Sequence, residues 1–496
     1  MRITWRWKWN PTEPHRGLPD APAFSRQRGL TAGIVSRRSL GVGAACGAVA
    51  LALLVRLPGM DHRLLPDEGY TWLVVSAQGP GAFLHRLAVY ENTPPLYYLL
   101  LTPFPLSDEP WLRLPSLIAG LATVAIVYAI ACRSLGMRVA LLAALVLAVA
   151  PYAVAESNFA RGFMLADVGL LIAFWAAVRL AKRLSWRWWW LYWAGAVVAV
   201  YSEYNAAATL VPLVIGLAFV MPSPRWRTVG LGALPALAFV PWVHQFARSL
   251  HDLDVTKTSL GYRTVTPPAV RDLVVNLFYG QSGLNLSALG RWAALLVLLT
   301  ALGFGGEAMR RRGPETRPLL LLLAWAGLGT FALHALAPAI GIGVFNVGYL
   351  TFLLPLGCLV LAQAVAAIPI RAAAPLAAIA LVGVGAGLAI KRLHSDTEPD
   401  PHLISRELRS AGVRTILTNS AVIAYYLRVE HPVLDRPFNL GRDRESDCTA
   451  CPRPIAIVDD SDVGSGARPG PGPVARVGHY EVRLVPDPRA AIPGRG

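Results

Sequence analysis

The sequence is poor in charged residues. Only 15% of its 496 residues are Asp, Glu, Lys or Arg, whereas soluble globular proteins carry about 25%. The mean hydropathy is +0.46. Apolar residues gather in repeated stretches of about 15 to 25 residues, which is the length needed to span a hydrocarbon core. These features exclude a soluble globular protein and predict a polytopic α-helical membrane protein.

Cysteine is also scarce, with five in the chain. Cys46, Cys132 and Cys358 lie in or at the ends of apolar stretches, where cysteine behaves as a small hydrophobic residue. Cys448 and Cys451 form a single CxxC in a polar region. Without a second pair, or histidines at ligand spacing, this is weak evidence for zinc. A local disulfide is the alternative if this region faces an oxidising compartment.

Acidic residues are outnumbered by basic ones, which gives a net charge of +16. The Arg and Lys residues lie mostly in short clusters between apolar stretches, a pattern typical of the cytoplasmic loops of membrane proteins. We therefore expect no nucleic-acid partner. Residues 1–38 hold eight basic residues and three tryptophans, and predict a disordered cytoplasmic tail.

Residues 39–392 form the predicted membrane domain, with outer loops at 59–112 and 247–289. The stretch Pro94–Leu106 is proline-rich and too short to cross, so we expect it at the outer interface. With a cytoplasmic N-terminus, this assignment puts nearly every basic cluster between spans on the cytoplasmic side. The eleven predicted spans are 39–57, 114–131, 139–155, 163–181, 188–202, 205–221, 228–246, 290–306, 318–337, 346–368 and 372–390.

The same topology gathers ionisable residues on the outer face. Ionisable groups at a membrane edge are costly to desolvate, which makes them candidates for function. A lone Asp-Glu pair such as Asp67-Glu68 would more often be two solvated loop residues. Here, however, other ionisable residues are predicted on the same face. The residues predicted on this face are Asp67, Glu68, Glu91, Asp108, Glu109, Arg113, Glu156, Arg161, Glu203 and Asn346.

Residues 393–496 are polar and rich in proline and glycine. We expect a small extracytoplasmic α/β domain here. Its predicted helices cover 402–412 and 420–428, and its predicted strands cover 414–418, 455–458 and 480–485.

Several short motifs follow one another in the first half of the chain. They are Asp67-Glu68-Gly69-Tyr70-Thr71-Trp72, Pro94-Pro95-Leu96-Tyr97-Tyr98, Leu112-Arg113-Leu114-Pro115-Ser116, Ala160-Arg161-Gly162-Phe163 after Glu156, and Tyr201-Ser202-Glu203-Tyr204. In order and spacing these motifs resemble those of the multi-spanning GT-C glycosyltransferases, and in particular glycosyltransferase family 39, with its protein O-mannosyltransferases and aminoarabinose transferases. The resemblance covers about residues 40–220 well and the remainder only in layout.

The resemblance implies a GT-C-like helical bundle in the cell membrane. It also implies a sugar donor carried on a polyprenyl phosphate, used on the extracytoplasmic face, and transfer to a hydroxyl of a protein, lipid or glycan. An acceptor hydroxyl has a pKa far above 7, so a carboxylate must take its proton as the new bond forms. Asp67 matches the family's first-loop acidic residue and is the expected base, with Glu68 supporting it.

The phosphate leaving group needs cations to stabilise its charge. Arg161 and Arg113 are the expected phosphate ligands, and Arg263, Lys257 and His244 are weaker candidates. Glu91 and Glu203 stand where relatives have histidine. With Glu156 and Tyr97 they are expected to support the site or bind the acceptor.

The segment Phe345–Pro355 lacks the Arg-Tyr pair of the relatives, and Asn346 and Tyr349 are its candidate substitutes. The family 39 branch is generally metal-independent, and Asp67 and Glu68 alone cannot complete a coordination shell. We expect no required metal or other cofactor.

Two alternatives stay open at this stage. One is a GT-C enzyme that extends a cell-wall polysaccharide with arabinose or mannose, using the same base. The other is a lipid or sugar transporter, a class that tends to place charges near the bilayer midplane and to show inverted repeats. The sequence shows no internal repeat.

Overall fold

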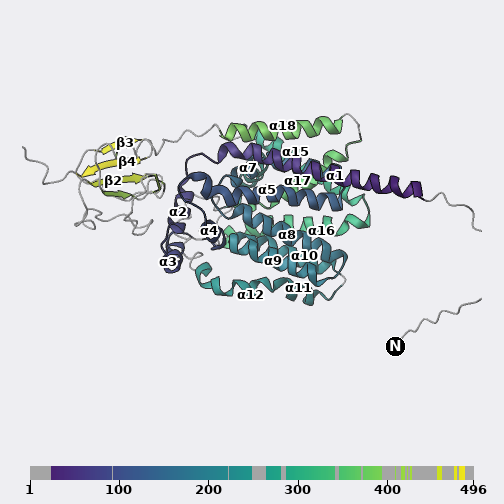
Figure 1. Ribbon diagram of the computed structural model, residues 1–496, viewed down its shortest axis with the longest axis horizontal. Coiled ribbons are helices and arrows are strands. Elements are labelled where there is room, and N and C mark those ends of the chain that lie inside the picture. Colours follow the sequence, from purple (N-terminus) through teal and green to yellow (C-terminus); the bar gives the residue numbers. More distant parts are fainter. Residues whose placement is uncertain are drawn as a thin grey trace, which may run out of the picture. The chain divides into compact units, whose positions relative to one another are not determined.

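The computed structural model (Figure 1) describes residues 24–91, 93–221, 223–247, 264–280, 286–340, 346–369 and 373–393. Beyond these it describes Leu408, Val422, Tyr425, Tyr426 and the four strands given below. The chain forms two compact units, Met1–Ala44 and Ala45–Gly496.

The described part of the chain is mainly helical. The main helices are α1 (Phe24–Arg56), α2 (Pro66–Val75), α3 (Pro80–Tyr90), α4 (Leu96–Leu101), α5 (Glu109–Ser134), α6 (Met137–Val149), α7 (Pro151–Ser157), α8 (Phe163–Lys182), α9 (Trp186–Ser202), α10 (Ala207–Val220), α11 (Arg225–Ala233), α12 (Pro235–Phe239), α14 (Pro267–Tyr279), α15 (Ala288–Arg310), α16 (Arg317–Leu336), α17 (Leu353–Ala366) and α18 (Ala373–Leu393). Short 3-10 helices include η1 (Leu57–Gly59), η2 (Tyr204–Ala206), η3 (Val240–Trp242), η4 (Pro314–Thr316), η5 (Ala337–Ile340) and η6 (Val347–Leu350).

Several of these helices are long and apolar enough to cross a membrane. Within the described ranges six qualify, and a seventh if α6 and α7 count as one broken span. Three further apolar helices, Tyr204–Val220, Leu353–Ala366 and Pro375–Leu388, have 10–17 residues. The predicted number of eleven crossings therefore stays a prediction. The six are Ser39–Gly59, Glu109–Ser134, Phe163–Lys182, Arg225–Ala247, Ala288–Arg310 and Pro314–Ala339.

The first helix begins earlier than the sequence suggested. Residues 24–38 were expected to be disordered, but α1 starts at Phe24 and continues to Arg56. No proline interrupts the chain between Pro22 and Pro58, so the helical hydrogen bonds of the apolar part extend without a break into the polar part. The rest of the predicted tail, residues 1–23, lies outside the described residues.

The predicted span 139–155 is broken in two. Helices α6 and α7 meet at an angle of 63°. Pro151 is the first residue of α7, and Ala150 before it is extended, with φ −62° and ψ 119°. A residue before proline disfavours the helical conformation, so the bend is local in origin. It turns the chain toward the segment that carries Arg161.

A buried arginine at the end of α1 forms hydrogen bonds with both helices of this bend. Arg56 is fully buried. Its Nε donates to Ser157 Oγ at 2.9 Å and its Nη1 donates to Ala148 O at 2.6 Å. A Cβ at Gly120 of α5 would lie 2.1 Å from Ser157 Oγ, so only glycine allows α5 to come this close. The end of α1, and the loop that leaves it, are thereby held against α5, α6 and α7.

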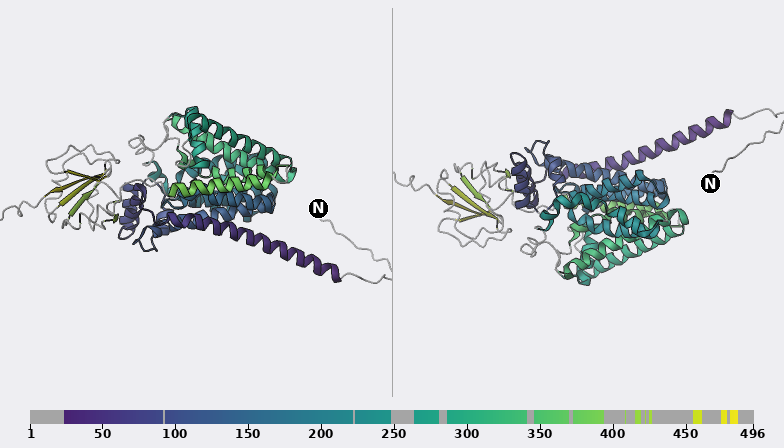
Figure 2. Two further views of the ribbon diagram at one scale, coloured as in Figure 1. Left: turned by 90° about the horizontal axis from the view of Figure 1, so that it is seen from above. Right: turned by 90° about the horizontal axis from the view of Figure 1, so that it is seen from below.

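Short helices α2, α3 and α4 gather at one end of the long helices, where Figure 1 labels them and Figure 2 shows the same dark blue segment from two further sides. Helix α4, in the proline-rich stretch Pro94–Leu106, has only six residues, which is too short to cross a bilayer. Part of the predicted outer loop 247–289 is also helical, as α14.

Four strands lie near the C-terminal end of the chain: β1 (Thr415–Thr418), β2 (Ile455–Asp460), β3 (Val474–Val477) and β4 (Tyr480–Val485). They form one sheet in the order β1-β2-β4-β3. The β1–β2 pair is parallel, and the other two pairs are antiparallel. Three strands lie where the sequence predicted them. The predicted helices 402–412 and 420–428 lie mostly outside the described residues, as do Cys448 and Cys451, so the α/β domain stays a prediction.

Candidate active site

Helix α2 separates the two adjacent carboxylates of the first motif. It begins at Pro66, whose fixed φ suits the first helical position. Successive helical residues point about 100° apart, so Asp67 and Glu68 face different surroundings. The side chain of Asp67 is 51% exposed, whereas that of Glu68 is 0% exposed.

Glu68 is held entirely by protein groups. Arg113 Nε donates to its Oε1 at 2.8 Å, and Arg113 Nη2 donates to its Oε2 at 2.6 Å. The N–H groups of Ala160 and Leu65 donate to the same two oxygens at 2.8 and 2.9 Å. The Leu65 bond caps the start of α2, since those first N–H groups lack helical partners.

Arg113 uses its remaining donors on the loop between α1 and α2. Its Nη1 donates to the carbonyls of Gly59, Met60 and His62, and its Nη2 donates to the carbonyl of Arg63 at 2.8 Å. With a side chain that is 2% exposed, Arg113 is engaged on all sides. The expectation that it binds the donor phosphate does not agree with these contacts.

Ala160 connects α2 to the Arg161 segment through both of its backbone polar groups. Its N–H donates to Glu68 and its carbonyl accepts from Thr71 Oγ1 at 3.0 Å. Glu68 and Thr71 lie three residues apart, on one face of the helix. Asp67 precedes Glu68 in the sequence, and Arg161 follows Ala160. Because Glu68 and Ala160 are hydrogen-bonded, the side chains of Asp67 and Arg161 meet beside this junction.

Arg161 stands at the centre of the cluster that results. Its Nη1 donates to Glu91 Oε2 and to Tyr98 OH, the latter at 3.0 Å. Its Nη2 lies 3.4 Å from Asp67 Oδ1. The Arg161 side chain is 11% exposed and that of Glu91 is 3% exposed, so Asp67 forms the solvent-facing edge. We name Asp67, Glu91, Tyr98 and Arg161 the carboxylate–arginine cluster.

Burial sets the protonation of this cluster. Burial raises the pKa of Glu91 to about 7, although Arg161 opposes the shift. For Arg161, burial lowers the pKa, but Glu91, Tyr98 and Asp67 raise it more, and it lies well above its ordinary value. Arg161 therefore keeps its charge at any physiological pH, whereas Glu91 titrates near neutrality. Glu91 Oε1 is buried and has no hydrogen-bond partner among the described residues.

Glu203 lies beside the cluster. It is buried, its Oε1 accepts from Asn205 Nδ2 at 2.9 Å, and burial raises its pKa while Arg161 lowers it. Tyr349 is within electrostatic range of Glu203, Asp67 and Arg161. Glu203 and Tyr349 line one hollow together with Asp167 of α8.

Two of the other expected site residues, Tyr97 and Glu156, lie deeper in the protein. Tyr97 is buried, donates to Leu112 O at 2.8 Å and accepts from Ser116 Oγ at 2.9 Å. Glu156 is buried in α7, within electrostatic range of Asp167. Neither is placed to meet an acceptor from solvent. His244 is exposed, and Lys257 and Arg263 lie outside the described residues.

Two residues of this region were not expected from the sequence. The sequence indicates no role for Tyr98 beyond its place in a motif, yet its hydroxyl contacts both Arg161 and Thr93 Oγ1. Asp167 is buried in an apolar helix, and its Oδ1 accepts from Thr351 Oγ1 at 3.1 Å. An acidic residue inside a predicted span was the available signal, since such residues rarely lack a role.

No metal site is evident in the part of the chain that the structure describes: there, no three His, Cys, Asp or Glu side chains converge as ligands would. Glu91 and Asp67 approach each other only through Arg161, whose positive charge lies between them.

A known protein family matches part of the chain. Residues 93–244, less than a third of the chain, match the profile of the dolichyl-phosphate-mannose-protein mannosyltransferase family. None of the curated proteins matches the sequence.

Solved structures match over most of the chain. ArnT from Cupriavidus metallidurans bound to undecaprenyl phosphate superposes with a TM-score of 0.62 at 16% identity, covering 89% of this chain and 98% of ArnT. Its apo state also gives 0.62, at 15% identity, covering 90% and 98%. The Archaeoglobus fulgidus oligosaccharyltransferase complexed with Zn and sulfate gives 0.50 at 13% identity, covering 85% and 68%.

The chain therefore has the fold of the GT-C glycosyltransferases and is a multi-pass membrane protein. The resemblance noted from the motifs is confirmed at the level of fold.

Proposed function

We propose that this GT-C chain transfers a sugar from a polyprenyl-phosphate donor to an acceptor hydroxyl, with Asp67 as general base. The observation that carries the proposal is the half-exposed Asp67 carboxylate beside a buried, permanently charged arginine. The Asp67 carboxylate can take a proton from an entering acceptor, and the Arg161 guanidinium can stabilise a departing phosphate. Both chemistries meet at one solvent-facing edge.

Asp67 is the best-placed base because it alone in the cluster is open to solvent. As the acceptor oxygen bonds to the anomeric carbon, its proton passes to the Asp67 carboxylate. At the same time the bond from that carbon to the phosphate oxygen breaks, and polyprenyl phosphate leaves with the electron pair. We infer inversion at the anomeric carbon, since one displacement suffices.

Arg161 would receive the phosphate. Glu91 and Tyr98 hold its Nη1, which leaves Nη2 directed at Asp67. A donor phosphate that binds Nη2 would displace Asp67 from the arginine. Asp67 would then lose its ion-pair partner, and its carboxylate would be free to meet the acceptor hydroxyl. Glu203 and Tyr349 would line the remainder of the site.

Glu68 and Arg113 would act as positioning residues rather than as the catalytic and phosphate-binding groups expected from the sequence. Their ion pair fixes the start of α2 and the Ala160 junction. Tyr97 would brace the same region through Leu112 and Ser116.

The lipid carrier and the sugar are argued from relatives. ArnT, which shares the fold, was solved with undecaprenyl phosphate bound. The matching family is described as acting with dolichyl-phosphate mannose on protein. We propose a polyprenyl-phosphate sugar for this chain, with mannose the first sugar to test and a protein, lipid or wall glycan as acceptor.

The topology completes the proposal. Eleven crossings with a cytoplasmic N-terminus would put the carboxylate–arginine cluster on the extracytoplasmic face. Residues 393–496 would then form a small α/β domain on the same side. Asp61 is exposed in the loop before α2, so cysteine labelling of an Asp61→Cys variant in intact cells tests this. More labelling by a membrane-impermeant reagent than in the parent protein supports the topology, and an increase seen only after lysis contradicts it.

The decisive experiment uses purified protein in detergent with a polyprenyl-phosphate sugar and an acceptor. We expect Asp67→Asn to bind donor but to lose transfer by about 10²- to 10⁴-fold. Asp108→Asn is the matched control, because Asp108 is an exposed carboxylate bonded to Ser107 Oγ at 2.8 Å. Near-normal transfer by the Asp67 variant would refute the proposed base.

The substrate class is tested in cells. Mass spectrometry of wall glycans, glycolipids and secreted glycoproteins from a deletion strain should show one sugar lost from one class. An unchanged profile in all three would argue against a transferase.

A further inference from the structure

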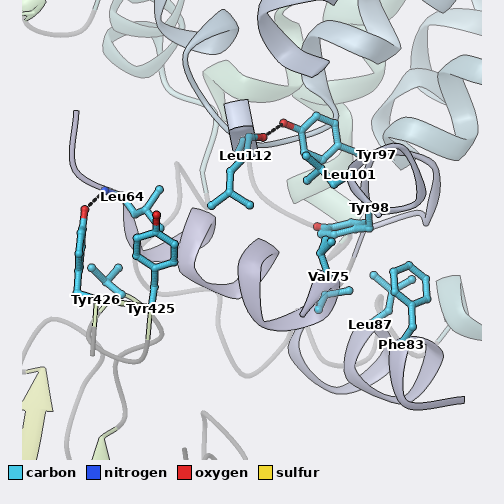
Figure 3. Close-up of a cluster of buried hydrophobic side chains, with 13 residues drawn as sticks. Leu64, Val75, Phe83, Leu87, Tyr97, Tyr98, Leu101, Leu112, Tyr425 and Tyr426 are labelled. Atoms are coloured by element: carbon cyan, nitrogen blue, oxygen red, sulfur yellow. Dashed lines mark hydrogen bonds between the residues drawn. The ribbon is translucent and has the colours of Figure 1, made fainter. Parts of the chain in front are cut away.

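A pair of tyrosines near the C-terminal end of the chain lies against the loop and helix that carry Asp67. Val422, Tyr425 and Tyr426 are helical and fall at i, i+3 and i+4 spacing, which places them on one face. All three are buried in a cluster that also contains Leu64 and Val75. Figure 3 shows Tyr425 and Tyr426 beside Leu64.

Two specific contacts join the tyrosines to this region. The Leu64 N–H donates to Tyr426 OH at 3.0 Å, across 362 residues of sequence. The ring of Tyr425 meets that of Trp72 on α2 edge to face, with centroids 5.6 Å apart and planes at 85°. Tyr425 and Tyr426 also pack edge to face on each other at 4.9 Å.

These contacts lie at both ends of the segment that presents the base. Leu64 stands immediately before the N-cap residue Leu65, and Trp72 lies five residues after Asp67. Arg113 and Ala160 hold α2 from the side of the membrane helices. The tyrosines hold it through other atoms, so their loss would leave the Glu68 contacts in place.

We propose that Tyr425 and Tyr426 are positioning residues that hold the Asp67 helix, so that the C-terminal region of the chain is needed for efficient transfer. The inference rests on the proposed function for its catalytic consequence, but not for the contact itself. An aromatic pair is well suited to this task, since its rings are rigid and its edge-to-face geometry is directional.

The test separates the contact from the activity. Tyr426→Phe removes only the hydroxyl, which accepts the Leu64 N–H bond and also interacts with Glu109 at the start of α5. In hydrogen-exchange mass spectrometry resolved to the Leu64 amide, we expect exchange to become about threefold to tenfold faster. Tyr201→Phe is the matched control, because Tyr201 OH also bonds a backbone group, donating to Ala238 O at 2.6 Å elsewhere in the protein.

Activity is measured on the same full-length variants in detergent with a polyprenyl-phosphate sugar. We expect kcat per donor-binding site to fall about threefold to tenfold in Tyr426→Phe, with KM for the donor unchanged. Tyr425→Ala should lower kcat per site further, whereas Tyr425→Phe should keep most of the wild-type kcat. A defect that is only structural would lower the number of donor-binding sites and leave kcat per site unchanged.

Each outcome is decisive. Unchanged Leu64 exchange in Tyr426→Phe would overturn the contact. Faster exchange with unchanged kcat would overturn the positioning role. If the wild-type protein transfers no sugar, the proposed function fails, while the exchange measurement still reports on the contact.

Discussion

Glu68 and Arg113, 45 residues apart in the sequence, form a two-pronged ion pair inside the protein, with N–O distances of 2.8 and 2.6 Å. The parallel arrangement matches the guanidinium fork to the carboxylate. Around it converge the loop that follows α1, the start of α2 and the Ala160 junction. Asp67 and Arg161 are adjacent because this pair holds their neighbours together.

The first prediction concerns this pair. Glu68→Gln leaves a buried guanidinium without its counter-charge, so we expect a loss of stability of about 3–5 kcal/mol. Thermal unfolding of the detergent-solubilised protein, followed by tryptophan fluorescence, measures it. Glu307→Gln is the control, because Glu307 pairs with Arg310 and Arg311 on an exposed face and should change the unfolding temperature little. Equal effects of the two substitutions would contradict the role given to Glu68.

Arg161 should govern donor affinity. Arg161→Gln removes the charge that would meet the phosphate, so we expect donor binding to weaken about tenfold to hundredfold. Arg161→Lys keeps the charge but not the geometry that reaches Glu91 and Asp67 together, and should recover only part of the loss. Binding of a polyprenyl-phosphate sugar in detergent is the measurement.

Arg86→Gln serves as the control for this prediction. Arg86 Nη1 donates to Leu73 O at 2.8 Å and to Ser76 Oγ at 3.1 Å, so it is a partly buried arginine bonded to neutral groups near α2. Its loss should leave donor affinity within about twofold of wild type. A weaker donor affinity in Arg86→Gln than in Arg161→Gln would count against Arg161 as the phosphate ligand.

Donor binding should depend on pH through Glu91. The pKa of this buried carboxyl is raised from 4.5 to about 7, so Glu91 is neutral below pH 7 in the folded protein. Asp67 is then the one charged carboxylate of the cluster beside Arg161, and the arginine is more available to the donor phosphate. Above that pH the Glu91 carboxylate competes for Arg161, and donor affinity should fall. The donor is a phosphodiester whose own charge is constant over this range, so the change belongs to the protein.

The Glu91→Gln variant isolates this effect, since its side chain keeps a similar shape without titrating. Its donor affinity should stay flat between about pH 5.5 and pH 8.5. Because the folded state binds the Glu91 proton more tightly than the unfolded state, wild-type stability should also decline between pH 4.5 and about pH 7 and then level off. A profile shared by wild type and variant would exclude Glu91 as its source.

Gly162 is predicted to be irreplaceable for steric reasons. Its φ is −72°, which any residue can adopt. A Cβ there, however, would lie 2.2 Å from the carbonyl oxygen of Ser202, at the end of α9. Gly162→Ala must push α8 from α9 and should cost about 1–3 kcal/mol. Because Glu203 follows Ser202, transfer should fall as well.

Gly303→Ala is the matched control for this substitution. Gly303 lies in α15, and a Cβ there would meet no heavy atom within 4 Å. Alanine favours the helix by about 0.5–1 kcal/mol over glycine, so thermal stability should hold or rise. If Gly162→Ala unfolds no earlier than Gly303→Ala, the close approach of α8 to α9 is not limiting.

Much of the fold follows from composition and from the order of the motifs. Apolar stretches of sufficient length predict membrane helices because hydrocarbon demands internally satisfied backbones. The short proline-rich helix and three of the strands were also predictable from local pattern. The bend at Pro151 was also predictable from the sequence, since proline restricts the conformation of the residue before it. The helical start at Phe24 does not follow from composition, because a polar, basic segment favours disorder even though no proline lies between Pro22 and Pro58.

The sequence by itself determined the class of protein and named Asp67, Glu91 and Arg161 as candidates. Only the tertiary structure decided which carboxylate meets which arginine. Asp67 and Glu68 are alike in chemistry and adjacent in sequence, so no local pattern shows which carboxylate is exposed and which is buried. A rotation of about 100° between helical neighbours sends one to solvent and the other to Arg113. The partners of both lie far along the chain, and packing of distant helices assigns them.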